Sequence, residues 1–423
     1  MAKPVVVGAL VISLLSACGG PSGAPQAESA PAVEVVDPGL GKSATGDVTI
    51  CGGQDAGGVY GGTVKAVNAA NKGLNVKYTQ IGADTDQLRT QAVQRLEGKS
   101  AECDIFMTDV TWVSEFASQK WFLDLTKVVE GKKDSLIPST ADTALYGGRY
   151  WGAPFFTNAG LMFYRTDRVA KPSTWQQVYQ EAAKAKESQL VYQGAQYEGL
   201  TVNFLELLYS AGGNVLDDDG KVVIDSKETR DVLNLMAEGL KTGAAPRSVL
   251  TFKEDETRVA FESGSAGYER NWPFVYKQLK ASSEADKFGV APLPAYGDKK
   301  TSSGVLGGFN FAVSAYSKNV AGAVAVIDFA LSPEWQKQIA IDNSRAPVVA
   351  AAYDDPKVQQ AMPFAQELRE AVTNAKPRPK SPVYAQISQA INKNVYSVLS
   401  GAATADEAVR KMSEEIKAAQ KTF

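Results

Sequence analysis

The sequence predicts an α/β protein that begins with a parallel sheet. Expected strands and helices alternate from Asp47 onward, with strands at 48–51, 74–81 and 103–107 and helices at 59–71 and 85–96. Apolar strands without a polar alternation are typical of parallel sheets that are covered by helices on both faces. Ligands of such sheets bind beyond the carboxyl ends of the strands, so the residues that follow these strands are the first candidates for a site.

Two of these strand ends carry candidate binding residues. The glycine-rich stretch 52–62 follows the first strand, but it has neither G-x-G-x-x-G nor the Gly-Lys-Ser/Thr ending of a phosphate loop. We expect its glycines to make turns or to approach a neutral ligand closely. Asp109 follows the third strand, where capping of the next helix and acceptance of ligand hydroxyls are both open.

The second half of the chain continues the α/β pattern. An extended segment at 145–165, rich in aromatic residues, is expected to cross between two lobes. Asp217–Gly220 is predicted to be a hairpin turn, because the spacing and distal glutamate of a calcium loop are missing. The remaining expected strands are 161–164, 190–197, 288–292 and 303–313, and the expected helices are 200–210, 227–241, 253–263, 320–330, 333–343 and most of the tail from 356.

The stretch 267–274 combines aromatic rings with carboxylate and amide groups. Pro273 ends the strand that carries Trp272, because proline cannot donate to a sheet ladder. The C–H faces of a sugar stack on aromatic rings, and its hydroxyls hydrogen-bond to polar side chains. A stretch that combines both is typical of a saccharide-binding pocket. The alternative is that Trp272 and Phe274 belong to an ordinary core.

Residues 375–384 interrupt the helical tail. Pro377 and Pro379 restrict the backbone on either side of Arg378, so its guanidinium is presented from a stiff loop. The alternative is an exposed surface arginine.

Composition excludes several classes of function. The 423 residues include 44 Lys and Arg against 47 Asp and Glu, without a basic stripe, which argues against nucleic-acid binding. Histidine is absent, which removes the usual general base, the commonest metal ligand and every Ser-His or Cys-His pair. We therefore expect no enzyme, no metal site and no cofactor.

The N-terminus predicts export and a lipid anchor. Lys3 precedes an apolar run at 5–15, which is typical of a signal peptide at 1–17. Leu-Ser-Ala-Cys ends at Cys18 and resembles the lipobox of bacterial lipoproteins, in which this cysteine carries the lipid; the alternative is a chance cysteine. Residues 18–46 are rich in Gly, Ala, Pro and Ser and predict a flexible tether. The expected location is the outer face of the bacterial cell membrane, reached through the lipid alone.

Cys51 and Cys103 are the remaining cysteines. An exported protein permits a disulfide. The expected strands place one cysteine at a strand end and the other at a strand start, so parallel pairing staggers the sulfurs by several residues. Because bridge geometry tolerates little stagger, a disulfide is not the favoured expectation.

Across nearly the whole mature chain, the sequence resembles the substrate-binding lipoproteins of ATP-driven (ABC) sugar importers, and particularly their trehalose/maltose-binding branch. Five motifs occur in the same order and at similar intervals as in that branch: MTDVTW at 107–112, QGAQYEGL at 193–200, ERNWP at 269–273, GGF at 307–309, and PRP at 377–379 with Tyr384.

The resemblance implies a type II periplasmic-binding-protein fold, in which a ligand cleft separates two lobes joined by three hinge crossovers. Lobe I is expected at 47–156 and 295–350, and lobe II at 157–294 and 351–423. The implied ligand contacts are Arg89, Asp109, Asn158, Trp272, Gly308 and Arg378, with Glu198, Phe156 and Phe309 also at the cleft and Asp55 as a further candidate. Asp109 and Arg378 are expected to bind hydroxyls from opposite lobes, and Trp272 to stack on one ring.

Three positions depart from the branch, where relatives often have Asp, Tyr and Trp in place of Asn158, Phe156 and Phe309. Each change removes a charge, a hydroxyl or an indole from the implied cleft, which leaves the particular disaccharide open.

The implied function is capture of a disaccharide such as trehalose, maltose or a related glucoside by a monomer that delivers it to a membrane permease. One alternative is an exported glycoside hydrolase that uses Asp109 and Glu269 as its paired carboxylates. Another is a binding protein for a different solute, such as a sugar-glycerol conjugate or an oligosaccharide.

Overall fold

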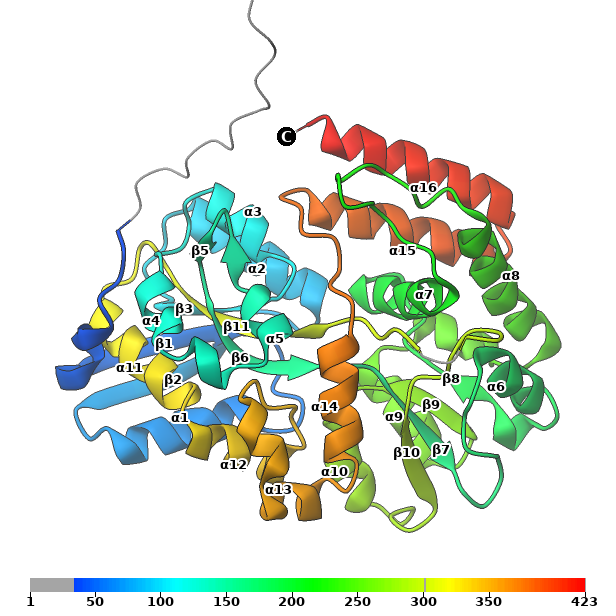
Figure 1. The fold of residues 1–423 in the computed structure, drawn as a ribbon, viewed down its shortest axis with the longest axis horizontal. Helices are drawn as coiled ribbons and strands as arrows, with labels where there is room; N and C mark the ends of the chain where they lie inside the picture. Colours follow the sequence, from blue (N-terminus) through cyan, green and yellow to red (C-terminus); the bar gives the residue numbers. More distant parts are fainter. Residues whose placement is uncertain (1–33, 300–301, 423) are drawn as a thin grey trace, which may run out of the picture. The chain divides into compact units, whose positions relative to one another are not determined.

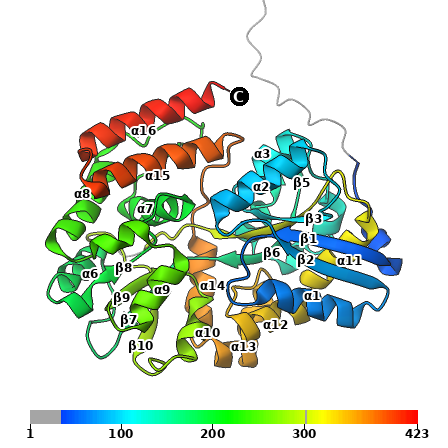
Figure 2. The same ribbon diagram turned by 180° about the vertical axis from the view of Figure 1, so that it is seen from behind.

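Two mixed β-sheets form the cores of two lobes. The computed structural model describes residues 34–299 and 302–422, which pack as one compact unit (Figures 1 and 2). The sheet of lobe I has the order β2-β1-β3-β11-β6, and the sheet of lobe II has the order β10-β7-β9-β8. The strands of lobe I are β1 (Gly46–Gly52), β2 (Leu74–Gln80), β3 (Ile105–Asp109), β6 (Ala153–Asn158) and β11 (Gly307–Val313), and those of lobe II are β7 (Leu161–Arg165), β8 (Leu190–Val191), β9 (Tyr268–Asn271) and β10 (Phe288–Pro292).

The predicted parallel sheet is confirmed for its first three strands. β1 pairs in parallel with β2 and β3, whereas β11 pairs antiparallel with both β3 and β6. The chain returns from lobe II to form β11, which inserts between β3 and β6, so pairings between distant segments decide the mixed character of the sheet. A further two-stranded hairpin joins β4 (Leu145–Tyr146) to β5 (Arg149–Tyr150).

Helices cover both sheets. The long helix α7 is buried along its whole length, because it packs against α8 and α15 inside lobe II. In lobe I the helices are α1 (Val59–Ala70), α2 (Thr85–Glu97), α3 (Val113–Ser118), α4 (Thr126–Glu130), α5 (Pro138–Asp142), α11 (Val320–Ala330) and α12 (Pro333–Asn343), with the 3₁₀ turns η1 (Pro38–Ser43) and η2 (Lys133–Ser135). The others are α6 (Trp175–Ala182), α7 (Glu198–Ala211), α8 (Lys227–Thr242), α9 (Glu254–Glu262), α10 (Val275–Lys280), α13 (Pro356–Ala361), α14 (Ala365–Asn374), α15 (Tyr384–Ser400) and α16 (Ala405–Gln420), with η3 (Lys186–Ser188), η4 (Arg247–Thr251) and η5 (Ala350–Asp354).

Most expected elements are present, and a few differ in length. The expected strand at 190–197 ends at Val191, where the chain leaves the sheet. It then passes close to the backbone of Val249: a Cβ on Gly194 would lie 2.5 Å from the carbonyl oxygen of Val249. The strand expected at 303–313 begins at Gly307. The predicted hairpin turn is confirmed by an antiparallel bridge between Leu216 and Val222.

The chain crosses between the lobes three times: between β6 and β7, between β10 and β11, and between α12, which packs on α1 and α11, and α15, which packs on α7 and α8. At the first crossing, Gly160 packs against a buried ion pair of Glu206 and Arg270. A Cβ there would lie 2.3 Å from the carboxylate and 2.7 Å from the guanidinium. Only glycine therefore fits this crossover without displacing the pair.

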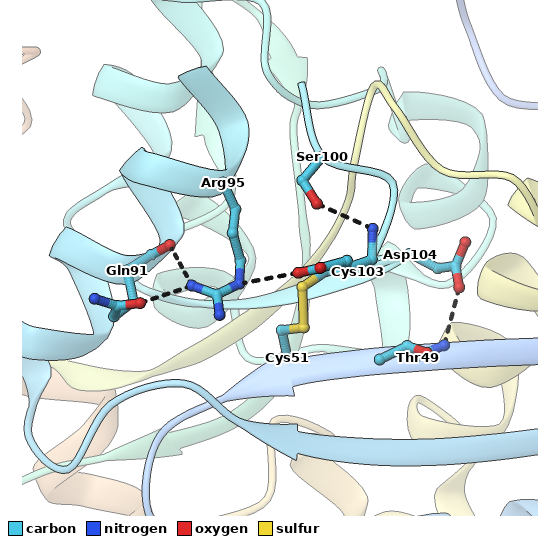
Figure 3. Close-up of a disulfide and its surroundings, with 8 residues drawn as sticks. Thr49, Cys51, Gln91, Arg95, Ser100, Cys103 and Asp104 are labelled. Carbon is cyan, nitrogen blue, oxygen red and sulfur yellow. Dashed lines mark hydrogen bonds and ion pairs between the residues drawn. A yellow bond between two sulfur atoms is a disulfide. The ribbon is translucent and has the colours of Figure 1, made fainter. Parts of the chain in front are cut away.

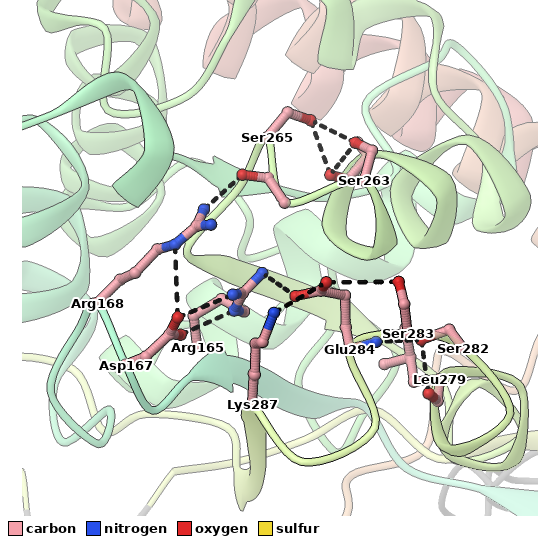
Figure 4. Close-up of polar contacts among 12 residues, drawn as sticks. Arg165, Asp167, Arg168, Ser263, Ser265, Leu279, Ser282, Ser283, Glu284 and Lys287 are labelled. Carbon is pink, nitrogen blue, oxygen red and sulfur yellow. Dashed lines mark hydrogen bonds and ion pairs between the residues drawn. The ribbon is translucent and has the colours of Figure 1, made fainter.

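A separate polar cluster fixes the end of β7 (Figure 4). The buried Arg165 pairs with Asp167 at 2.9 Å and with Glu284 at 2.8 Å. Arg168 donates to the carbonyl of Gly264. These contacts hold three loops of lobe II together.

Residues 34–46, which the sequence places in the flexible tether, are folded against lobe I. Val36 is buried, and Val35 forms a bridge with Asp124. Asp37 caps the turn η1, which packs on α11. The expected signal peptide at 1–17 and the lipidated Cys18 lie outside the described residues. No helix of the described part is long and apolar enough to cross a membrane.

Cys51 and Cys103 form a disulfide, so the expectation from strand stagger is wrong (Figure 3). β3 begins at Ile105, so Cys103 precedes the strand and is not held by its register. The next residue, Asp104, instead fixes this turn on β1. Its N–H donates to the carbonyl of Thr49, and its carboxylate accepts from the N–H of Thr49, both at 2.9 Å. The two Cα atoms lie 5.7 Å apart, within the range that a bridge requires.

Replacing both cysteines by serine is expected to lower the free energy of unfolding by roughly 2–4 kcal/mol, because the bridge closes a loop of 52 residues in the unfolded chain. Urea unfolding of the oxidised protein, the reduced protein and the double variant measures this. An unfolding midpoint that is the same in all three would contradict it.

Candidate ligand-binding cleft

A cavity of about 360 Å³ lies between the lobes. It is within the size range of small-molecule sites. Lobe I and its crossovers contribute Gly53, Gln54, Ala56, Tyr60, Ala83, Asp84, Thr85, Leu88, Asp109, Asn158, Gly307, Gly308, Phe309 and Arg345, and lobe II and the loop before α15 contribute Glu198, Gly199, Val202, Lys253, Glu254, Asp255, Glu256, Trp272, Phe274 and Arg378. Seven of the residues predicted from the sequence are therefore brought to one cavity: Asp109, Asn158, Glu198, Trp272, Gly308, Phe309 and Arg378.

Arg378 joins carboxylates from the two lobes. Its guanidinium donates to Asp109 at the end of β3 at 2.9 Å and to Glu198 at the start of α7 at 2.6 Å. Tyr384 and Ser388 on α15 also donate to Glu198. All three charged residues are buried, so Arg378 is not the exposed arginine that the sequence left as an alternative.

The protonation of this group follows from burial and pairing. Burial raises the pKa of Glu198, although Arg378 acts in the opposite direction. Burial alone would lower the pKa of Arg378, but the field of Asp109 and its other neighbours outweighs burial and raises it. Arg378 is thus a permanent cation, and its buried Nε has no hydrogen-bond partner in the structure.

Trp272 is positioned by the buried pair at the first crossover. The guanidinium of Arg270 lies over the indole ring, 4.0 Å from its centroid. Arg270 is itself held by Glu206 at 2.7 Å and by Gln193 at 2.9 Å. Because one ring face is taken by Arg270 and Trp272 lines the cavity, the opposite face is the one that a ligand can use.

Strands β6 and β11 form one wall of the cavity. Asn158 lies opposite Gly307 in the ladder, and its side-chain oxygen is buried without a hydrogen-bond partner in the structure. Gly308 has a φ of 124°, and a Cβ there would lie 2.4 Å from the carbonyl oxygen of Phe156. This residue therefore has to be glycine, and the backbone of the wall stays open to a ligand.

Three of the predicted site residues do not line the cavity. Arg89 forms an ion pair with Glu115 and lies in an adjoining hollow of about 460 Å³, which shares Thr85 and Glu198 with the cavity. Asp55 binds the N–H groups of Tyr60 and Gly61 at 3.0 and 2.9 Å, so it caps the start of α1. Phe156 is buried behind the wall.

Sequence reasoning missed several residues of the cavity. Asp84 caps α2 and pairs with Lys253 at 2.6 Å, which links lobe I to lobe II beside the cavity. Glu254 lies at the start of α9, where burial raises its pKa. Asp84 directly precedes the helix expected at 85–96, which is a visible signal for a helix cap. Nothing in the sequence indicated that Asp84 would pair with Lys253.

Glu269 is not a residue of the cavity. It is fully buried in lobe II, where Asn271 donates to it at 2.6 Å, and burial raises its pKa to about 8. The expected hydrolase pair of Asp109 and Glu269 is therefore not assembled in the cavity. Among the described residues no group of side chains is arranged to hold a metal ion.

These features define the class of the protein: a two-lobed binding protein whose ligand site lies between the lobes. Residues 58–337 match the family described as bacterial extracellular solute-binding protein, and the chain belongs to that family. The family indicates an extracytoplasmic location.

Individual relatives agree with this assignment. A probable ABC transporter-binding protein of Deinococcus radiodurans is 32% identical over 370 residues, which cover 82% of this chain and 87% of the relative. The maltose-bound structure of MalE3 from T. maritima superposes with a TM-score of 0.83 at 31% identity and covers 88% of this chain and 99% of that one. A ribitol complex from Agrobacterium radiobacter K84 has a TM-score of 0.81 at 22% identity and covers 90% of this chain and 100% of that one; at this identity the likeness shows the fold alone. The chain is thus an extracellular solute-binding protein of the kind that serves ABC sugar transporters.

Glu269→Gln is expected to flatten the pH dependence of stability. The buried carboxyl keeps its proton in the folded protein up to a pKa of about 8, against 4.5 for an ordinary glutamate. The contribution of this carboxyl to the free energy of unfolding is therefore complete below pH 4.5. It falls by up to about 1.4 kcal/mol per pH unit as the pH rises from 4.5 to 8. Urea unfolding at pH 5 and pH 8 measures the slope, with the exposed Glu367→Gln as control; equal slopes in Glu269→Gln and the wild type would contradict the interpretation.

Proposed function

We propose that this protein captures a disaccharide of the trehalose/maltose class for import by an ABC transporter. The observation that carries the proposal is that the Arg378 group and the free face of Trp272 line one cavity between the lobes. Charged groups bind neutral hydroxyls with about 1.5–3 kcal/mol each, and an aromatic face takes the C–H face of a sugar ring. A few such contacts are sufficient for a micromolar site, which requires about 8 kcal/mol. MalE3, at 31% identity, is a maltose-bound protein, which supports the same ligand class here.

Closure of the lobes is the proposed mechanism of capture. A ligand that contacts both lobes binds the closed state better than the open state and shifts the population toward it. The ion pair of Asp84 and Lys253 joins the lobes beside the cavity and adds to the stability of the closed state. The closed monomer then docks on a membrane permease, while the lipid on Cys18 keeps the protein at the outer face of the cell membrane.

A glycoside hydrolase is not favoured by the geometry. Such an enzyme needs two carboxyl groups on either side of the glycosidic bond. Glu269 is buried in lobe II, and Asp109 is bound to Arg378. No second function is therefore proposed.

Titration calorimetry with trehalose, maltose, sucrose and related glucosides is the direct test. We expect at least one of them to bind with micromolar affinity and to be recovered intact after incubation. Absence of binding at millimolar concentration for all of them would remove the disaccharide claim, and release of monosaccharide would favour the hydrolase.

Trp272→Ala is expected to weaken binding of that disaccharide by about 10-fold or more, because the stacking surface is lost. Trp272→Phe keeps an aromatic face and should lose less. Calorimetry compares the three proteins, and circular dichroism checks their folding. Undiminished affinity in a folded Trp272→Ala protein would show that the ring does not stack on the sugar.

A further inference from the structure

Arg345 is a cation of the cavity that sequence reasoning did not foresee. It follows α12, whose C-terminus is closed by Ser344 at a φ of 49°. The N–H of Arg345 binds the carbonyl of Ile339 at 3.3 Å, and the next residue, Ala346, forms a bridge with Thr157 beside the wall of the cavity. The backbone at Arg345 is therefore fixed by a helix end on one side and a strand on the other.

The side chain of Arg345 lies close to two rings from different lobes. Its guanidinium lies 4.9 Å from the ring centroid of Phe156 and 4.6 Å from that of Phe274. One of its nitrogens donates to the carbonyl of Ala56. Its Nε is buried without a hydrogen-bond partner in the structure, and the residue as a whole is 4% exposed. Both rings thus attract the cation, and its Nε has no acceptor among the described residues.

The other cations of the cavity are already paired with carboxylates. Arg378 is bound to Asp109 and Glu198, and Lys253 is bound to Asp84. Arg345 lines the same cavity and forms no ion pair with a described residue. The carboxylate of Asp55 attracts it, but both oxygens of that carboxylate bind N–H groups of α1.

A buried cation without a partner is costly, because the group loses its hydration and gains no compensating charge. Burial accordingly lowers the pKa of Arg345, although an arginine remains charged at neutral pH. Such a group persists at a binding site when a ligand supplies the missing acceptors.

We propose that Arg345 is a ligand-binding residue that determines specificity by donating to two adjacent acceptor oxygens of the ligand. The planar, double-donor edge of arginine matches a pair of neighbouring oxygens better than a single one. The inference rests on the proposed function and deepens it: the bound sugar has such a pair where it meets Arg345. Two neighbouring hydroxyls of a neutral sugar or the carboxylate of an acidic sugar would both supply it.

Calorimetry on Arg345→Met and Arg345→Lys tests the proposal, with Arg369→Met as the matched control, because Arg369 pairs with Asp354 outside the cavity. The probes are the disaccharide that binds best, its single-deoxy analogues and its uronic-acid counterpart. We expect Arg345→Met to lose about 10- to 100-fold in affinity and the control to lose none. Stronger wild-type binding of the neutral sugar assigns Arg345 to hydroxyls, and stronger binding of the acid assigns it to a carboxylate.

Two further measurements distinguish ligand binding by Arg345 from a purely structural role of this residue. If Arg345 binds two adjacent hydroxyls, the wild type binds the analogues that lack one of them more weakly; if it binds a carboxylate, the wild type binds the sugar without the carboxylate more weakly. In either case Arg345→Met binds the complete sugar and that analogue with similar affinity. Equal losses for all analogues, or unchanged affinity in Arg345→Met, would overturn the proposal.

The melting temperature without ligand gives an answer that does not depend on which sugar is tried. A residue reserved for a ligand predicts that Arg345→Met melts at the same temperature as wild type or higher, whereas a lower melting temperature would overturn the proposal. If wild type binds none of the sugars, the disaccharide function fails, and this measurement still decides the role of Arg345.

Discussion

Arg378 holds two carboxylates from different lobes at the centre of the molecule. Removing three charged groups from water costs several kcal/mol for each ion, and mutual pairing has to compensate that cost. The compensation is available here because Asp109 ends a strand of lobe I, Glu198 begins a helix of lobe II, and a loop stiffened by two prolines brings the arginine between them. The same ionic group that ties the lobes together also provides polar atoms to the cavity.

The walls of the cavity depend on contacts behind them. Trp272 keeps its orientation because Arg270 covers its inner face, and Arg270 is fixed in turn by Glu206. That ion pair packs directly against Gly160, at a crossing between the lobes. The crossing between the lobes and the position of the Trp272 ring are therefore physically connected, because both contact one buried ion pair.

In lobe I, the disulfide ties together two segments of the sheet that carries residues of the cavity. It joins β1 to the turn before β3, and the carboxyl ends of these two strands lead to Gly53 and Asp109 in the cavity. This covalent link holds β1 and the turn that precedes β3 together when the chain fluctuates. An exported protein can form such a bridge because its surroundings are oxidising.

The sequence by itself determined the local structure and the types of residue that reach the site. Alternation of apolar and polar residues, helix caps and prolines act over short distances, so most helices and strands were predicted close to their observed bounds, as for the helices at 320–330 and 333–343. The ends of expected strands and helices drew attention to Asp109, Trp272 and Arg378, and the resemblance to sugar-binding lipoproteins added Glu198. The antiparallel return of β11, the disulfide of Cys51 and Cys103, the pairing of Asp84 with Lys253, and the unpaired Arg345 between Phe156 and Phe274 were decided only by the tertiary structure. Each of these depends on the meeting of segments that are about 50 to 210 residues apart, and local propensity carries no information about which distant segments will meet.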